Sequence, residues 1–334
     1  MQKSSTFLDL VIKFGFLALM AGLIIFFSIM AEGFLSPFSA VFILQSVAIT
    51  GILALGVTAT LVVDGFDLSI GAVATSALML SSYVMVVWEL SAFWAVAFSL
   101  AMGAFVGVIN GLLIVKFKVP DLLATLGMMF LLLGAQRIPT EGRSISTGMA
   151  LPNGSIANGT FSETFLMLGR HRIADLVPLS VVFLIAAAVL IWVFLELTRH
   201  GRLMYAIGSN AQAASLAGTN VHRYKVLAYM ISGMMASLGG ILLAARLGRG
   251  DVASGNNLLL DAVAAALIGF AVLGLGKPNA FGTAIGALFV GILLQGLTML
   301  NAPYYTQDFI KGAVLVVALM FTFALSGRSG RGKA

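Results

Sequence analysis

The sequence predicts an all-α polytopic membrane protein with about ten transmembrane helices. Hydrophobic residues make up 60% of the 334 residues and charged residues only 10%, and the mean hydropathy is +1.05. A soluble domain carries about a quarter charged residues, so lipid has to cover this much apolar surface. Apolar runs of roughly 20 residues, the length that crosses a bilayer as a helix, recur along the whole chain.

Ten apolar segments are predicted to cross the membrane. Their ranges are 10–31, 41–63, 66–86, 91–115, 120–138, 176–197, 225–246, 259–276, 279–300 and 307–325. The first is long enough to span and is interpreted as a retained helix rather than a cleavable signal peptide. The fifth and eighth are short and interrupted by glycine, so their boundaries are the least well defined.

The distribution of basic residues predicts that both termini lie in the cytoplasm. With an even number of spans the termini share one side, and twelve of the nineteen Lys and Arg residues then fall at cytoplasmic ends. Membrane proteins accumulate positive residues on that side. This explains the formal charge of +6 better than nucleic-acid binding does, and it makes segment 139–175 an extracytoplasmic loop.

Residues 199–225 form the one long connection between apolar spans that is basic and lacks Asp and Glu. A run of small residues at 211–218 lies at its centre and suits a short helix. The charge rule places this segment in the cytoplasm. A docking-sized element on one side of the bilayer is the main functional clue in the sequence.

A weak internal repeat suggests two inverted halves. Asn-Gly-Leu at 110–112 and Gln-Gly-Leu at 295–297 are each followed, sixteen residues after the glycine, by another glycine, with a proline in between. The first copy lies in a span expected to run inward and the second in a span expected to run outward. Two inverted five-helix repeats, about 10–138 and 176–325, would place a substrate path at their interface. Chance matching of glycine-rich apolar sequence is the alternative.

Glycine spacing predicts close helix packing. Gly103, Gly107 and Gly111 form two GxxxG steps, and Gly282 and Gly286 form another. In lipid this spacing lets two helix backbones approach. We therefore expect these glycines to serve packing rather than chemistry.

Two acids flank a glycine between the second and third spans. Asp64 and Asp67 could form a cation site or proton relay, because ionisable groups near the membrane are often functional. We favour a tight turn, in which Asp67 or Ser69 caps the helix that begins near Gly71. A metal site would need more ligands nearby.

Side chains within or near the spans are candidates for lining a translocation path. They are Asn110, Thr125, Asp261, Phe270 and Gln295. Asn110 either bonds to a neighbouring helix or faces the pore. Asp308 precedes Lys311 by three residues, a spacing that allows an ion pair on a helix.

Several kinds of chemistry are excluded. The chain has no cysteine, its three His residues show no metal-ligand spacing, and GxxxxGK[ST] is absent. We therefore expect no enzyme, no metal and no cofactor bound by this chain. If ATP drives transport, Mg-ATP binds to another polypeptide.

Several ordered motifs resemble the permease subunits of bacterial ATP-binding-cassette (ABC) importers for ribose and other simple sugars. Residues 65–71 (GFDLSIG) resemble the family's GxDLSxG segment, residues 107–127 its GxxNG…VP…TLG stretch, and residues 260–265 its LDAxAA segment. Residues 201–233 resemble its cytoplasmic coupling segment. The resemblance runs almost from end to end.

The resemblance implies one permease domain over residues 1–334, in a bacterial cytoplasmic (inner) membrane. Two permease subunits, identical or similar, would form the pore. Cytoplasmic ATPase subunits would drive it, and an extracytoplasmic binding protein would deliver a sugar or sugar-like solute. The coupling helix would run roughly from 208 to 221. The implied ATPase-coupling residues are Gly201, Arg202, Gly208, Asn210, Ala213, Ala214, Ala217, Gly218, Asn220 and Val221.

The chain departs from the family pattern at Leu259, where Glu is usual, and at Phe270 and Leu275, where glycines are usual. These differences leave open whether the substrate is a neutral sugar, a polyol, a nucleoside or a sugar-like signal molecule. The main alternative function is an ion-coupled secondary transporter or channel. Its candidate coupling charges, Asp64, Asp67, Asp261 and Lys311, are expected at span ends, which disfavours it. A membrane-embedded enzyme would need a triad, metal cluster or paired acids, and the sequence indicates none.

Overall fold

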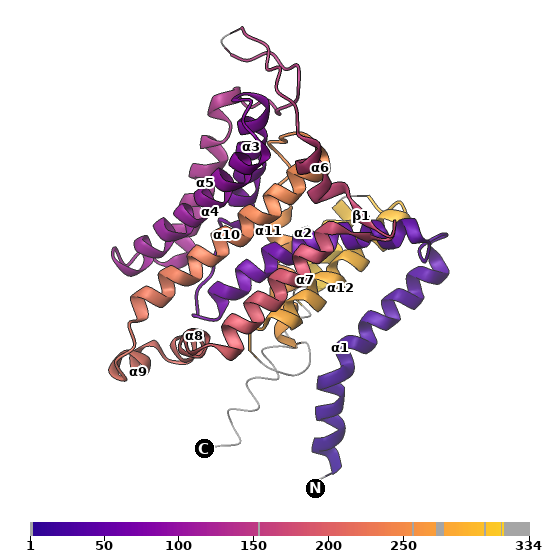
Figure 1. The fold of residues 1–334 in the computed structure, drawn as a ribbon. Helices are drawn as coiled ribbons and strands as arrows, with labels where there is room; N and C mark the ends of the chain where they lie inside the picture. The colour runs from indigo at the N-terminus through magenta and orange to yellow at the C-terminus, as the bar shows by residue number, and fades with distance from the viewer. Residues whose placement is uncertain are drawn as a thin grey trace.

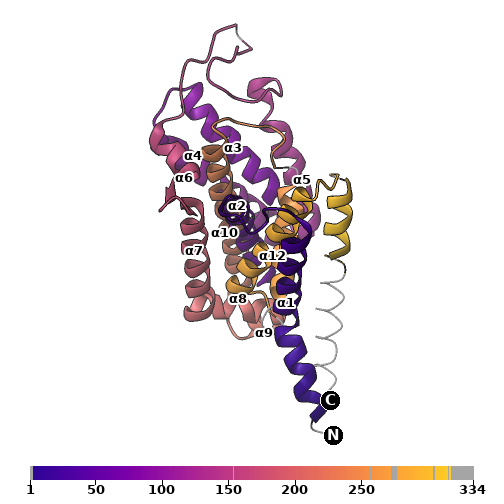
Figure 2. The same cartoon turned by 90° about the vertical axis from the view of Figure 1, so that its right-hand side faces the viewer.

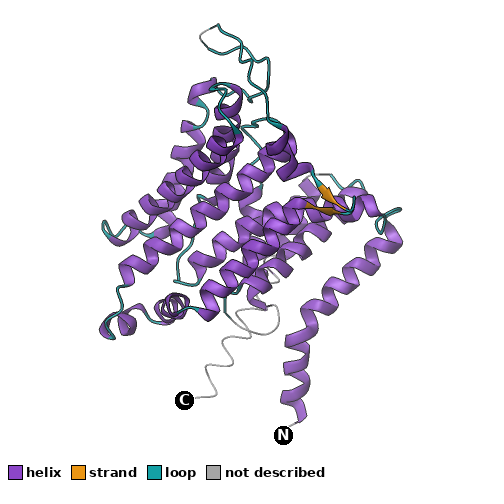
Figure 3. Cartoon of the chain, in the orientation of Figure 1, coloured by secondary structure: helices purple, strands orange, loops and turns teal. Residues whose placement is uncertain are grey.

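A computed structural model describes residues 3–152, 154–255, 257–271, 277–303, 305–314 and 316, and it is mostly helical (Figure 3). A helix lies at each predicted span. These are α1 (Lys3–Met30), α2 (Pro37–Leu61), α3 (Ile70–Val86), α4 (Ala92–Val115), α5 (Asp121–Ala135), α7 (Leu179–Trp192), α10 (Val221–Leu247), α11 (Leu258–Ala271) and α12 (Ala280–Met299), with residues 305–314 also helical.

Six of the described helical segments are long and apolar enough to cross a membrane. They are Pro37–Leu61, Ala92–Val115, Asp121–Thr140, Leu179–Leu197, Val221–Leu247 and Ala280–Met299. Phe16–Met30, Ile70–Val86 and Leu258–Gly269 are shorter apolar helices. The prediction of an all-α polytopic membrane protein is therefore confirmed. Parts of the predicted eighth and tenth spans, 272–276 and 317–325, and the C-terminus lie outside the described residues.

Short elements lie at the two ends of the bundle. The connection after α5 contains η1 (Ile138–Thr140), α6 (Glu163–Arg170) and the antiparallel strands β1 (Arg172–Ile173) and β2 (Val177–Pro178). A π-helical turn, η2 (Val193–Leu197), precedes α8 (Arg199–Ser209) and α9 (Ala211–Leu216). Figures 1 and 2 show α8 and α9 at the end where α1 begins, and the long connection after α5 at the opposite end.

Helix α2 lies at the centre of the bundle. Its residues 47–60 are all buried, and it packs against α7, α10, α11 and α12. An apolar helix without a polar face is covered on all sides. By contrast, α4 and α5 keep large apolar side chains exposed, including Phe105 and Phe130, as expected for helices that face lipid.

Two glycine seams hold neighbouring helices together. A Cβ atom added at Gly103 or Gly107 would collide with the α10 backbone at Gly233 or Tyr229. Glycines 282 and 286 of α12 lie in the same way against the α11 backbone. The expected packing role of these GxxxG steps is therefore confirmed, and the absence of a side chain is what permits the contact.

The helix packing follows a paired pattern. The second span, α2, packs on α12, and the seventh, α10, packs on α4. Likewise α3 packs on α4, and α11 packs on α12. When spans two, three and four (α2, α3 and α4) are exchanged with spans seven, eight and nine (α10, α11 and α12), the contact of α2 with α12 becomes that of α10 with α4. The contact of α3 with α4 likewise becomes that of α11 with α12.

Replacing Gly107 with Ala should destabilise the protein, because the new methyl group collides with the Tyr229 carbonyl, which is helix backbone and cannot rotate away. Overpacking of this kind costs about 1–3 kcal/mol. Thermal unfolding of the detergent-purified chain should show a lowered midpoint. Gly127→Ala in α5 is the matched control, since nothing lies within 4 Å of its added Cβ. Equal unfolding midpoints for Gly107→Ala and Gly127→Ala would contradict the close packing of α4 on α10.

Candidate functional site

The segment 62–69 between α2 and α3 is irregular and largely buried, and side chains from other helices satisfy its backbone. The Phe66 amide donates to Asp121 Oδ2 at 2.8 Å, and the Leu68 amide donates to Thr125 Oγ1 at 3.1 Å. The Tyr229 hydroxyl donates to the Phe66 carbonyl at 3.3 Å. Helices α5 and α10 are thus bonded to this segment rather than only packed against it.

A carboxylate inside this segment organises a buried polar cluster, here called the Asp67 hub, made of Asp67, Ser69, Asn110 and Ser232. Asp67 is 1% exposed. Its Oδ1 accepts from the Ser69 amide at 2.9 Å and from the Ser69 hydroxyl at 2.6 Å. Its Oδ2 accepts from the Ser232 hydroxyl of α10 at 2.7 Å, and the Asn110 amide of α4 donates to Ser69 Oγ at 2.9 Å.

The hub changes the interpretation of the predicted turn. Asp64 is exposed in a turn with φ of 55°. Asp67 lies two residues before the N-cap of α3, at a span end as expected, but its side chain is buried. Ser69 occupies the N-cap position of α3 without a side-chain capping bond. Its hydroxyl bonds to Asp67 and Asn110 instead. Gly71 follows in the first turn, where a Cβ atom would lie 3.1 Å from the Gly255 carbonyl.

Asn110 and Thr125, two of the predicted path residues, are both part of this bonding. Each is completely buried. Asn110 leaves its Oδ1 without a hydrogen-bond partner among the described residues. Across the described part of the chain, no group of three His, Cys, Asp or Glu side chains could hold a metal ion. The geometry gives these two side chains a positioning role toward segment 66–69.

The predicted coupling helix from 208 to 221 is wrong in its boundaries. Helix α8 ends at Ser209 and α9 runs only from Ala211 to Leu216. Asn210, with φ of −161° and ψ of 99°, separates them, and its side chain caps α9 by accepting from the Ala213 amide at 2.9 Å. An extended residue cannot continue a helix, so the segment turns here.

Three of the predicted coupling residues contact this chain's own bundle. A Cβ atom at Gly201 would collide with the Leu195 carbonyl of η2, and one at Gly208 with the Val62 carbonyl at the start of segment 62–69. Arg202 is exposed and its guanidinium donates to the Leu197 carbonyl at 3.3 Å. Helix α8 therefore packs on the bundle through Gly201 and Gly208, and it connects α9 to the bundle.

Helix α9 and the link after it carry the exposed part of the segment. Ala213 and Ala217 are exposed, whereas Ala214 is buried. Leu216 is 91% exposed. Gly218 adopts φ of 83°, a left-handed conformation that favours glycine. The remaining two predicted residues, Asn220 and Val221, start α10, and Asn220 caps it by accepting from the Arg223 amide at 3.1 Å.

A second contact of α8 was not predicted. The Tyr205 hydroxyl lies 2.7 Å from the Pro278 carbonyl and 3.2 Å from Glu196 Oε1, and donates to one or the other. Lys277 Nζ bonds to both Glu196 oxygens, at 2.9 and 3.2 Å, and lies 4.5 Å from the Tyr205 ring centre. Burial and the Glu196 carboxylate raise the pKa of Tyr205, so the hydroxyl keeps its proton. The sequence signal that could have predicted this contact is the position of two charges: Glu196 at the end of one apolar span and Lys277 just before another.

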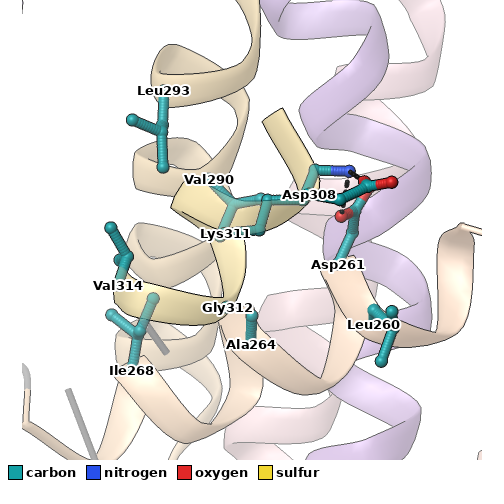
Figure 4. Close-up of a pocket in the computed structure, with 10 residues that line it drawn as sticks. All are labelled: Leu260, Asp261, Ala264, Ile268, Val290, Leu293, Asp308, Lys311, Gly312 and Val314. Carbon is teal, nitrogen blue, oxygen red and sulfur yellow. Dashed lines mark ion pairs between the residues drawn. The ribbon is translucent and has the colours of Figure 1, made fainter. Parts of the chain in front are cut away.

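A separate charged group lies between α11 and the helix 305–314 (Figure 4). Lys311 Nζ lies 3.1 Å from Asp261 Oδ1 and 3.7 Å from Asp308 Oδ1. The predicted pair of Asp308 and Lys311 is confirmed, but Asp261 is the closer partner. These side chains line a small pocket of about 100 Å³. Gln295 is half-buried on α12, and the side chain of Phe270 lies outside the described residues.

Comparison with known proteins is consistent with these motifs. Residues 39–319 match the family described as branched-chain amino acid transport system / permease component. Ribose import permease protein RbsC of Escherichia coli K12 is 36% identical over 288 residues, 83% of each chain. RbsC of Bacillus subtilis is 35% identical over 321 residues, covering 96% of this chain and 92% of the relative. Fructose import permease protein FrcC of Rhizobium meliloti is 32% identical over 308 residues, covering 91% and 82%.

No solved structure matches the chain. Because the family match covers most of the sequence, the chain belongs to this family of permease components of membrane transport systems. It is a transport subunit and not an enzyme, and the resemblance inferred from its motifs is confirmed.

Replacing Asp67 with Ala should cost on the order of 2–3 kcal/mol of stability, because the hydroxyl groups of Ser69 and Ser232 and the Ser69 amide lose their acceptor in a buried site. The thermal unfolding midpoint of the purified chain measures this loss. Asp64→Asn is the matched control, since Asp64 is exposed and Asn tolerates its left-handed backbone. Equal unfolding midpoints for the two variants would show that the Asp67 hub does not stabilise the protein.

Proposed function

We propose that this family member is the membrane permease of an ATP-driven ABC importer for a sugar or sugar-like solute in a bacterial inner membrane. The named relatives import ribose and fructose. The chain has no GxxxxGK[ST] motif, so Mg-ATP binds to partner ATPase subunits. A binding protein on the other side of the membrane delivers the solute.

The observation that carries this proposal is the exposure of α9. A six-residue helix at one end of the bundle presents Leu216 at 91% exposure, with Ala213 and Ala217 also exposed. An isolated apolar side chain among small residues fits a shallow apolar groove on a partner. We assign α9, from Ala211 to Leu216, as the element that docks on the ATPase.

The proposed transport mechanism follows from the contacts of α8 with two loops of the bundle. Gly208 contacts the Val62 carbonyl at the start of segment 62–69, and Tyr205 contacts the Pro278 carbonyl just before α12. These two loops belong to different halves of the chain. When the ATPase moves α9, α8 transmits the displacement to both halves, and rigid-body rocking of one half against the other alternates access to the solute.

The paired helix packing supports the finer architecture that we propose. Two inverted five-helix repeats make each helix contact occur twice, once for each half. The contact of α2 with α12 corresponds to that of α10 with α4, and the contact of α3 with α4 corresponds to that of α11 with α12. The domain is then a single unit over 1–334, with half-repeats 10–138 and 176–325 and ten spans. Its N- and C-termini are cytoplasmic, and 139–175 faces the binding protein.

A second copy of this permease, or a similar one, completes the proposed pore. Asp261 and Gln295 remain candidates for lining the translocation path, because the first joins an ion pair beside a pocket and the second is half-buried on α12. Asn110 and Thr125 act instead by positioning segment 66–69, through the bonds described above.

Leu216→Asp should abolish uptake of labelled sugar and co-purification of the ATPase, because a charge replaces the apolar side chain that enters the partner's groove. The test uses the chain co-expressed with its partner ATPase and binding protein. We expect at least a tenfold loss of bound ATPase, while the variant permease is still inserted at normal levels.

Ile156→Asp is the control for this experiment. Ile156 is also an exposed large apolar side chain, 60% exposed, but it lies in the connection at the opposite end of the bundle. This variant should retain its ATPase. Normal ATPase binding by Leu216→Asp would refute docking through α9. An equal loss of bound ATPase in the two variants would also refute it. Absence of sugar uptake by the intact wild-type assembly would refute the substrate class.

A further inference from the structure

We propose that an anionic phospholipid binds to this protein at the end of the bundle that carries α8 and α9. The site is an open pocket between the α4–α5 link and the first turns of α10, with a volume of about 630 Å³. Its lining residues are Leu112, Val115, Lys116, Lys118, His222, Arg223 and Val226.

The pocket concentrates basic groups without acids. Lys116 and Lys118 come from one wall and His222 and Arg223 from the other, and no Asp or Glu lines it. Among the residues that the structure describes, none of these four side chains takes part in an ion pair or hydrogen bond. Unpaired cations that face one another repel, and an anion between them removes that cost.

The acid nearest in sequence is not available to neutralise the pocket. Asp121 follows the α4–α5 link, but its Oδ2 accepts from the Phe66 amide at 2.8 Å and its Oδ1 from the Leu122 amide at 2.9 Å. Its carboxylate is thus directed toward backbone amides. An anion from outside the chain would therefore meet basic side chains in the pocket and no acidic one.

The apolar part of the lining favours a lipid over a soluble anion. Leu112, Val115 and Val226 belong to α4 and α10, which are among the helices long and apolar enough to span the membrane. Phe105 of α4 and Phe117, two residues after the end of α4, are each 66% exposed. A ligand with an anionic phosphate head and apolar chains matches both parts, with the head among the cations and the chains along α4. Basic pockets between membrane helices bind such head groups.

A lipid in this position would contact two elements of the bundle. Arg223 and His222 lie in the first turn of α10, directly after the link from α9, and Lys116 and Lys118 lie at the end of α4. The phosphate would brace the base of α10 against the α4–α5 link. This inference needs only membership in the permease family and does not depend on ATPase docking through α9.

The test measures binding of phosphatidylglycerol to the detergent-purified full chain by native mass spectrometry, with phosphatidylcholine as the zwitterionic comparison. The double variant Lys116→Gln/Arg223→Gln removes one cation from each wall. Because each basic group near an anionic lipid contributes appreciably, its affinity for phosphatidylglycerol should fall roughly tenfold or more. Both side chains are exposed, and a monodisperse elution profile checks that the variant is folded.

Arg199→Gln/Arg202→Gln is the control, since it removes two exposed charges from the same end of the bundle outside the pocket. It should change the affinity less than threefold. Equal losses in the two variants, or equal binding of both lipids, would overturn the site. Glycerol phosphate competing as tightly as the lipid would identify a soluble-anion site instead. Unchanged lipid binding with loss of the ATPase would identify a protein contact.

Discussion

An irregular backbone inside a membrane bundle must have its polar groups bonded within the protein, because lipid offers no partner. Segment 62–69 meets this constraint with side chains from three helices. From α5, Asp121 and Thr125 accept from its amides, and from α10, Tyr229 donates to the Phe66 carbonyl and Ser232 to Asp67. From α4, the Asn110 amide donates to Ser69 Oγ. Without this segment, α4, α5 and α10 would share only apolar contacts, and no polar bond would set their register.

This constraint explains why motifs far apart in the sequence occur together. GFDLSIG at 65–71, the Asn110-Gly111 step, and the start of α5 at Asp121 are parts of one bonded structure. The glycines of α4 bring its backbone against α10. Asn110 of α4 then bonds to Ser69, and Ser232 of α10 bonds to Asp67. Packing and hydrogen bonding therefore depend on each other.

Apolar runs and glycine spacing were sufficient to predict the helices and their seams, because both properties are local. The Asp67 hub was not predictable in this way. Its bonds join residues 41 and 165 positions apart, and a window of hydropathy contains no information about them. The short helix expected in the small-residue run 211–218 is present as α9, but the bounds 208 to 221 were not predictable, for a different reason. Asn210 caps α9 and so separates it from α8, and the packing of Gly208 depends on Val62, which lies in another loop.

Helix α10 begins directly after the α9 link and continues for 27 residues, a rod of about 40 Å. At its far end the Arg170 side chain donates to the Arg246 carbonyl at 3.0 Å, so α6 rests on the top of the same rod. Tilting a rod of this length by about 10° about its base moves its tip by about 7 Å, well beyond the reach of that hydrogen bond. In the proposed transport mechanism, a displacement that begins at α9 would therefore reach α6, at the opposite end of the bundle, through α10.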